Sequence, residues 1–268
     1  VERELAAVVQ GDATPLMPFA ADGEHRAARA AVIIAAEAAQ AGAATRSATG
    51  SLTAGEALLL AEQKRRHNFL GDADELARKA VAAEPDNAEA IHTLGIIAHQ
   101  SGKLDEAIEH LRRAVALAPE TALYHANLGE MSRMAGRIGE AIAAGRRALE
   151  LDPDKPGARS NLGIALFDQG QFAEALGCYE RAIALQPDFA LAHSNRGNAL
   201  QRLKRFAEAE PAHRRALELR PDFADGWNNL GTCLRELGRL DEAESAYGEA
   251  LERQPNNPDT LDNLALAL

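Results

Sequence analysis

Proline recurs along this chain at a constant spacing of 34 residues, and this regularity restricts what the chain can fold into. The series consists of Pro85, Pro119, Pro153, Pro187, Pro221 and Pro255. A period of that length is typical of repeat architectures, in which one small structural unit is copied along the chain. Each unit of such an array packs on its neighbours, so the chain forms a solenoid without a central core.

Other residue types keep the same register as the prolines. A block ending in glycine follows each of the first five prolines, and its copies are Thr93-Leu94-Gly95, Asn127-Leu128-Gly129, Asn161-Leu162-Gly163, Asn195-Arg196-Gly197 and Asn229-Leu230-Gly231. A Glu-Ala pair comes later in each unit, at 106–107, 140–141, 174–175, 208–209 and 242–243, and another alanine lies seven residues beyond it. This pattern resembles the tetratricopeptide repeat, a helix–turn–helix unit.

The resemblance sets the domain organisation. With each unit numbered from 1 to 34, the full copies are 88–121, 122–155, 156–189, 190–223 and 224–257. A degenerate copy occupies 54–87, where Ala61 replaces the usual glycine, and a half copy occupies 258–268. The predicted fold is therefore all-α, a right-handed superhelical solenoid over 54–268. Residues 1–53 are predicted to be an N-terminal helical extension and linker, with a helix over 24–41 that caps the first repeat.

Each repeat is predicted to hold two amphipathic helices, A and B. Glycine at position 15, as at Gly102, ends helix A because it adopts a left-handed conformation without Cβ strain. Three residues break the pattern. Gly145 replaces a large residue and predicts a packing gap or a weakened helix. Arg196 replaces a leucine and is expected to bury its aliphatic stem. Pro211 lies inside a helix B and is expected to kink it or unwind a turn.

Composition excludes several classes of protein. The net charge is −11 and the isoelectric point is near 5.3, which argues against a nucleic-acid partner. No apolar run is long enough for a membrane span, and the sequence shows no signal peptide. We therefore expect a cytoplasmic protein. Arginine outnumbers lysine and alanine is abundant, which suggests a bacterial gene.

Catalytic and cofactor motifs are missing from the sequence: it has no dinucleotide or phosphate-binding loop, no zinc-peptidase motif and no nucleophile elbow. His92 and His99 lie seven residues apart on one helix, too far to share a metal ion, and are expected to be solvated. His125, His193 and His213 are expected to be partly buried packing residues. Cys178 and Cys233 have neither disulfide nor metal-site spacing. We expect no enzyme activity, no cofactor and no metal in this chain.

Asparagine at position 6 is the pattern with functional content. It recurs in the order Asn127, Asn161, Asn195, Asn229 and Asn263, and we call this series the asparagine ladder. The resemblance implies that helix A lines a concave groove, where amides repeated once per unit can bond the backbone of an extended peptide. The alternative is that these amides only bond neighbouring helices. Further candidate groove residues are Glu130, Arg133, Asn198, Arg202, Asn228 and Arg235.

Two functions follow from the resemblance. The first is a non-enzymatic scaffold that binds a protein or an extended peptide in the concave groove. The second is the substrate-recruiting region of a larger enzyme, because the asparagine ladder resembles that of the O-linked N-acetylglucosamine transferases. Scattered arginines do not favour the carboxylate clamp found in a subfamily of these repeats. Leu264, Leu266 and Leu268 leave an apolar C-terminal edge, which predicts either a longer native chain or self-association through this edge.

Overall fold

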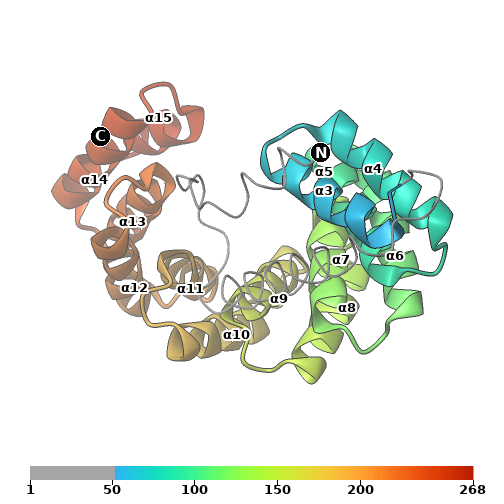
Figure 1. The fold of residues 1–268 in the computed structure, drawn as a ribbon. Coiled ribbons are helices and arrows are strands. Elements are labelled where there is room, and N and C mark those ends of the chain that lie inside the picture. The colour runs from blue at the N-terminus through green and yellow to red at the C-terminus, as the bar shows by residue number, and fades with distance from the viewer. Residues whose placement is uncertain (1–51, 268) are drawn as a thin grey trace. The chain divides into compact units, whose positions relative to one another are not determined.

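The structure is a computed structural model that describes residues 52–267, and this part of the chain contains thirteen α-helices and no strand (Figure 1). The predictions for residues 1–51 lie outside the described residues. The helices are α3 (Ala54–Arg66), α4 (Leu70–Ala83), α5 (Ala88–Gln100), α6 (Leu104–Leu117), α7 (Ala122–Met134), α8 (Ile138–Leu151), α9 (Pro156–Asp168), α10 (Phe172–Leu185), α11 (Ala190–Arg202), α12 (Phe206–Leu219), α13 (Ala224–Glu236), α14 (Leu240–Arg253) and α15 (Pro258–Ala265).

Odd-numbered helices are the predicted A helices and even-numbered helices are the predicted B helices. Residues 57–268 form one unit by their contacts, and the description that follows is of this unit. Every helix packs on the next one along the chain from α4 to α15. In addition, α7 contacts α9, α9 contacts α11, and α13 contacts both α11 and α15, whereas successive B helices make no comparable contact. The A helices therefore lie on the inner side of the curved row and the B helices on the outer side (Figure 1).

The turn from helix A to helix B is built as predicted. Position 15 has a positive φ in each of these turns, from 72° to 83° at the glycines Gly102, Gly136, Gly170 and Gly238. Asn68 and Lys204 take the same position with φ of 62° and 63°. In the first of the glycine turns the amide of Lys103 reaches back to the carbonyl of Ala98, which satisfies a carbonyl at the end of α5.

The turn from helix B to the next helix A carries a contact that the sequence analysis did not predict. A side-chain N–H at position 4 of helix A donates to the carbonyl of the periodic proline before it. The four pairs are His125 with Pro119 (2.8 Å), Arg159 with Pro153 (2.7 Å), His193 with Pro187 (2.9 Å) and Trp227 with Pro221 (3.0 Å). Each bond satisfies the carbonyl of a proline in the turn that follows helix B. His125 and His193 are buried, as predicted.

Glycine at position 8 lets helices A and B of one repeat approach closely. A Cβ built on Gly163 would lie 2.6 Å from the ring of Tyr179, and one on Gly231 would lie 2.6 Å from the ring of Tyr247. The same slot between the helices is filled by Leu111 beside Gly95 and by His213 beside Gly197. Helix B presents buried alanines at positions 20 and 27, which include Ala107, Ala175, Ala209 and Ala243, each fully inaccessible to solvent.

The structure contradicts the unwinding predicted at Pro211 and agrees with the burial predicted for Arg196. Pro211 lies inside α12, yet the helix is continuous from Phe206 to Leu219, so the predicted unwinding is wrong. Pro211 and Ala207 are exposed, so the ring projects into solvent and water reaches the carbonyl that Pro211 cannot bond. Arg196 is half-buried, as predicted, and its guanidinium lies 3.8 Å from the carboxylate of Glu180 on α10.

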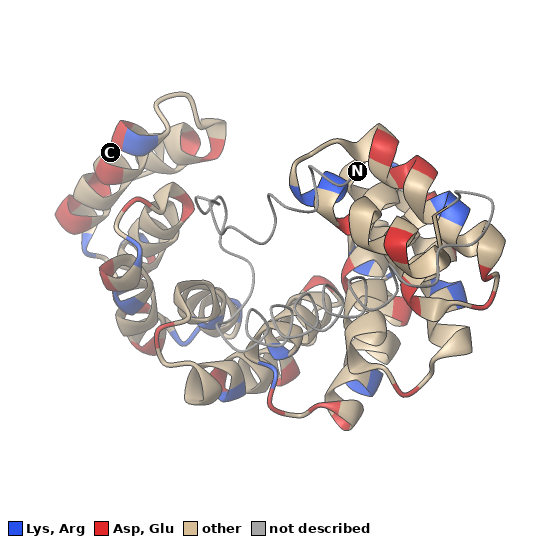
Figure 2. Ribbon diagram, in the orientation of Figure 1, with Lys and Arg blue, Asp and Glu red and all other residues tan. Residues whose placement is uncertain are grey.

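Arginine and glutamate side chains join successive B helices on the outer surface, where Figure 2 shows basic and acidic residues interspersed. Arginine at position 25 reaches glutamate at position 19 of the next repeat. The pairs are Arg78–Glu106 (2.7 Å), Arg112–Glu140 (2.7 Å), Arg146–Glu174 (3.1 Å) and Arg214–Glu242 (3.3 Å). The pair between the repeats 156–189 and 190–223 is missing, because position 25 there is Glu180.

No helix within residues 52–267 is both long enough and apolar enough to cross a membrane.

Two glycine-to-alanine changes in one repeat test the close approach of helices A and B. Gly163→Ala is expected to lower the free energy of unfolding by roughly 1–3 kcal/mol, because the new Cβ meets the ring of Tyr179. Gly177→Ala on α10 meets open space and is expected to raise it by about 0.5–1 kcal/mol through helix propensity. Urea unfolding followed by circular dichroism measures both. Equal effects of the two changes would contradict this account of the packing.

Candidate functional site

The candidate site is the inner face, which we define as positions 2, 5, 6, 9, 12 and 13 of the A helices. The eleven residues predicted from the sequence lie on five successive A helices. Asn127, Glu130 and Arg133 lie on α7, Asn161 on α9, Asn195, Asn198 and Arg202 on α11, Asn228, Asn229 and Arg235 on α13, and Asn263 on α15. The seven asparagines among them are all half-buried. The repeat therefore places one amide of the ladder on each A helix from α7 to α15.

Three amides of the ladder bond a side chain of the preceding A helix. The Nδ2 of Asn127 donates to the Nε2 of His92 (2.8 Å), and the Nδ2 of Asn263 donates to the Oδ1 of Asn228 (3.0 Å). A longer bond of 3.4 Å joins the Nδ2 of Asn161 to the Oε2 of Glu130. These three amides therefore bond neighbouring helices; that they do nothing else stays a prediction. Each bond uses one of the two N–H groups of its amide and leaves the oxygen unused.

The other two members of the ladder have no such bond. Among residues 52–267, the side chains of Asn195 and Asn229 make no hydrogen bond to another protein group, although both are half-buried. Half-buried amides without a partner are costly unless water or a ligand bonds them. The ladder thus contains a stretch, from α11 to α13, where two successive amides are available for another molecule.

His92 is buried more deeply than predicted. Its ring stacks on Tyr124 with centroids 4.5 Å apart, and its Nε2 accepts the amide of Asn127, so its proton resides on Nδ1. Burial lowers the pKa of His92 to about 4, against a smaller opposing effect of the Glu62 carboxylate. The prediction of a solvated histidine is therefore wrong, because the aromatic side chain of α7 covers the ring.

The three arginines predicted as site residues all have protein partners. Arg133 lies 3.3 Å from Asp168 on the next A helix, and Arg235 lies 3.5 Å from Glu236. The guanidinium of Arg202 lies over the rings of Phe172 (4.2 Å) and Phe167 (5.6 Å), a cation–π arrangement. The structure spreads these three side chains over three helices and does not bring them together around one site.

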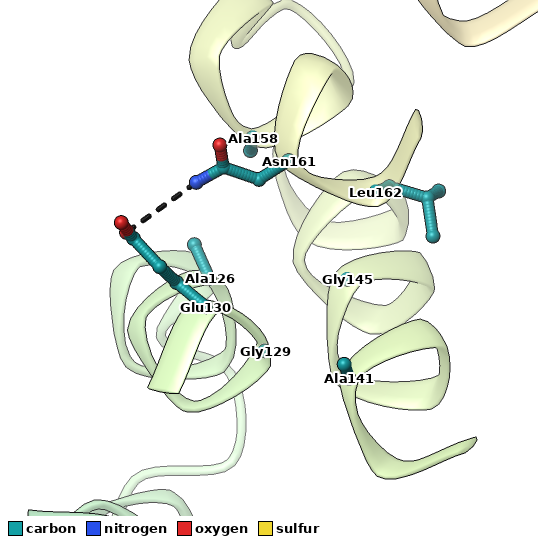
Figure 3. A pocket seen from close by; sticks show the side chains of 8 residues that line it. All are labelled: Ala126, Gly129, Glu130, Ala141, Gly145, Ala158, Asn161 and Leu162. Carbon is teal, nitrogen blue, oxygen red and sulfur yellow. Dashed lines mark hydrogen bonds between the residues drawn. The ribbon is translucent and has the colours of Figure 1, made fainter. Parts of the chain in front are cut away.

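Gly145 leaves a gap, as predicted. It occupies the slot filled by Leu111, Tyr179, His213 or Tyr247 in the other full repeats, while α8 continues unbroken from Ile138 to Leu151. The gap is a cavity of about 10 Å³ between α7, α8 and α9, close to the size of one water molecule. Its lining consists of Ala126, Gly129, Glu130, Ala141, Gly145, Ala158, Asn161 and Leu162 (Figure 3).

The cavity borders the inner face. Ala126, Glu130 and Asn161 occupy positions 5, 9 and 6 of their repeats, so they belong to both surfaces. Figure 3 shows the side chains of Glu130 and Asn161 directed toward each other from α7 and α9. Sequence analysis predicted the gap and each of these side chains separately. It could not predict that they meet, because that depends on how α9 packs against α7.

His213 fills the slot beside Gly197 and is completely buried. Neither of its ring nitrogens has a hydrogen-bond partner among the described residues. Burial away from water lowers the pKa of His213 to about 4, because the protonated ring would lose its hydration without gaining a partner. The predicted packing role of His213 is therefore confirmed.

The cysteines lie apart from the inner face. Cys178 is half-buried on α10, and the thiol of buried Cys233 donates to the carbonyl of Phe206 (3.3 Å). Burial raises the pKa of both thiols. Within residues 52–267 no three histidine, cysteine, aspartate or glutamate side chains are grouped in a way that could hold a metal ion.

The paired helices, the close approach at position 8 and the constant stride define a helical-repeat solenoid. The sequence pattern described as "Tetratricopeptide repeat" matches residues 58–120, 92–156 and 195–258, and the pattern described as "TPR repeat" matches residues 165–204. These matches extend over more than half of the sequence. The chain belongs to the tetratricopeptide repeat family. No curated protein matches the sequence.

Solved structures share this fold. The Cut9 complex "APC/C hetero-tetramer Cut9-Hcn1" is 22% identical with a TM-score of 0.70, over 81% of this chain and 43% of that chain. MamA is 28% identical with a TM-score of 0.57, over 62% of this chain and 96% of its own. YrrB, described as "a TPR protein with an unusual peptide-binding site", is 21% identical with a TM-score of 0.59, over 72% and 98%. The chain thus spans less than half of the matched chain in the Cut9 complex.

The buried His213 predicts a pH-dependent stability. The pKa of His213 in the folded protein is about 4, below the ordinary value of 6.5. As the pH falls, the unfolded chain therefore binds a proton at this histidine before the folded protein does. The folded state loses stability as the pH falls from about 6.5 toward 4. At pH 5 the loss is roughly 2 kcal/mol. His213→Tyr, which copies Tyr179 and Tyr247, is expected to remove this part of the pH dependence.

Urea unfolding at pH 7.5, 6 and 5 gives the free energy of unfolding of His213→Tyr and of the unchanged protein. The effect is the difference between these two values at each pH. Exposed His67→Gln serves as the control and should leave the profile unchanged. His92 contributes in the same direction and is present in all three proteins, so its effect cancels. If the difference in free energy of unfolding between the two proteins stays constant from pH 7.5 to pH 5, the lowered pKa assigned to His213 is refuted.

Proposed function

We propose that this chain is a non-enzymatic scaffold that binds an extended segment of another protein along the inner face of its A helices. The observation that carries the proposal is the asparagine ladder, above all the unbonded amides of Asn195 and Asn229. They stand at the same position of successive A helices, half-buried and without a protein partner. An extended backbone offers alternating N–H and C=O groups that match the donors and acceptors of such amides.

The spacing of the ladder suits an extended chain. Packed helices lie about 8–10 Å apart, and an extended backbone advances about 3.3 Å per residue. The ladder would then meet the bound backbone about once every three residues. Such contacts bind the main chain of the partner and do not distinguish between most of its side chains. Selectivity must come from other inner-face residues between the amides.

The bridging amides fit the same role. Asn127, Asn161 and Asn263 fix the preceding A helix with one N–H and keep their oxygen and second N–H for a ligand. YrrB, which shares the fold, is described as having a peptide-binding site, which supports the view that a solenoid of this kind can hold a peptide.

The second hypothesis, a substrate-recruiting region of a glycosyltransferase, rests on the resemblance of the ladder alone and stays a prediction. Self-association through the C-terminal edge also stays a prediction. It is supported by the side chains of Leu261 and Leu266 on and after α15, which are 46% and 73% exposed. A cytoplasmic location is likewise an expectation from the sequence.

Removing the two unbonded amides tests the proposal. Asn195→Ala combined with Asn229→Ala is expected to weaken binding by about 1 kcal/mol for each amide, or roughly 30-fold in total. The probe is a set of linear 12-residue peptides selected from a random library on the unchanged 268-residue chain, and fluorescence anisotropy measures their affinity. Circular dichroism verifies that the variant is folded.

The matched control is Asn256→Ala, which removes an exposed amide in the loop before α15 and should leave affinity unchanged. Undiminished binding by the folded double variant, or failure of the unchanged protein to select any peptide, would reject the proposed role of the ladder.

A further inference from the structure

Glu130 differs from the other acidic residues of the inner face. Glu62 pairs with Arg65 (2.8 Å), Asp168 with Arg133 (3.3 Å) and Glu236 with Arg235 (3.5 Å). The remaining acidic residues of this face are exposed to water: Glu89, Asp225, Asp259 and Asp262. Glu130 is half-buried, and among residues 52–267 it has no cationic partner and only the long bond from Asn161.

Glu130 and Asn161 line the cavity beside Gly145, and Figure 3 shows their side chains with the others of the lining. The lining is formed by small or aliphatic residues apart from Glu130 and Asn161. The cavity accepts one group of the size of a water molecule. An ammonium group has that size, whereas the planar guanidinium of arginine is much larger.

We propose that this cavity is a lysine-binding pocket, and the inference rests on the proposed function. The ammonium of a lysine in the bound segment bonds the Glu130 carboxylate, and the Oδ1 of Asn161 supplies a second acceptor. The lysine replaces the long bond of 3.4 Å between Asn161 and Glu130 with an ion pair, in which both the donor and the acceptor carry a charge.

Charge and position support a lysine over other side chains. The chain has a net charge of −11, so its long-range field attracts basic segments. Glu130 lies on α7 and Asn161 on α9, so the pocket is in line with the ladder and one repeat before Asn195. An extended segment bonded by the ladder therefore passes over the pocket. The ladder supplies contacts to the backbone, and the pocket selects one side chain.

Peptide selection on the full chain tests the pocket. Linear 12-residue peptides selected from a random library are expected to share a lysine at a fixed place. The selected peptides are then synthesised with an acetylated N-terminus. Acetylation of the shared lysine, or its replacement by arginine, should weaken binding to the unchanged protein at least 10-fold.

Glu130→Gln should weaken binding of the lysine peptide to a similar extent and make it insensitive to lysine acetylation. The matched control, Glu244→Gln, removes an exposed carboxylate of the outer helix α14 and should behave as the unchanged protein.

The outcomes separate this inference from the proposed function. Peptides that depend on Asn195 and Asn229 but show no lysine preference would overturn the pocket alone. Binding of the lysine peptides to Glu130→Gln with undiminished affinity would do the same. Peptides that bind only with a free N-terminus would assign the site to an α-amine and overturn the lysine assignment. A chain that selects no peptide would overturn both proposals.

Discussion

The close approach of helices A and B within each repeat is the constraint on which the other features depend. Glycine at position 8 removes the side chain that would keep the helices apart, and buried alanines on helix B do the same from the other side. Because this approach is copied every 34 residues, each A helix stands in the same relation to the next. A residue type repeated at one position then becomes a row on the inner face, as the asparagine ladder does.

The residue that fills the slot beside position 8 differs among the repeats. The slot holds leucine, glycine, tyrosine, histidine and tyrosine in the five full copies, at Leu111, Gly145, Tyr179, His213 and Tyr247. The backbone keeps one form in all five, so the changes appear as local properties. One copy has a cavity on the inner face, and another has a buried imidazole without partners. The fold therefore tolerates different residues in this slot, and each residue gives its own repeat a local property.

Most of the fold was predictable from the sequence because the period fixes the helices and the turns. Gly102 was predicted to end helix A of the first full copy; this helix ends at Gln100, and Gly102 has the expected positive φ. The wrong predictions concerned side chains whose surroundings come from other helices. Tyr124 covers His92, and solvent exposure of Pro211 lets α12 continue. The bonds from position 4 to the proline carbonyls were also missed, because histidine, arginine and tryptophan share a donor but no recognisable motif.

The outer surface implies that the row of repeats is not equally stiff along its length. At four junctions between neighbouring repeats, an arginine of one B helix forms an ion pair with a glutamate of the next B helix. The junction between 156–189 and 190–223 carries Glu180 there, and Glu208 across from it is occupied by Arg205 of its own repeat. This junction is held by helix packing, by the longer contact from Arg196 and by Arg202, which lies over the rings of Phe167 and Phe172. The ion pairs that resist spreading of the B helices at those four junctions are therefore missing between α10 and α12, and salt, which weakens exposed ion pairs, changes this junction less than those four.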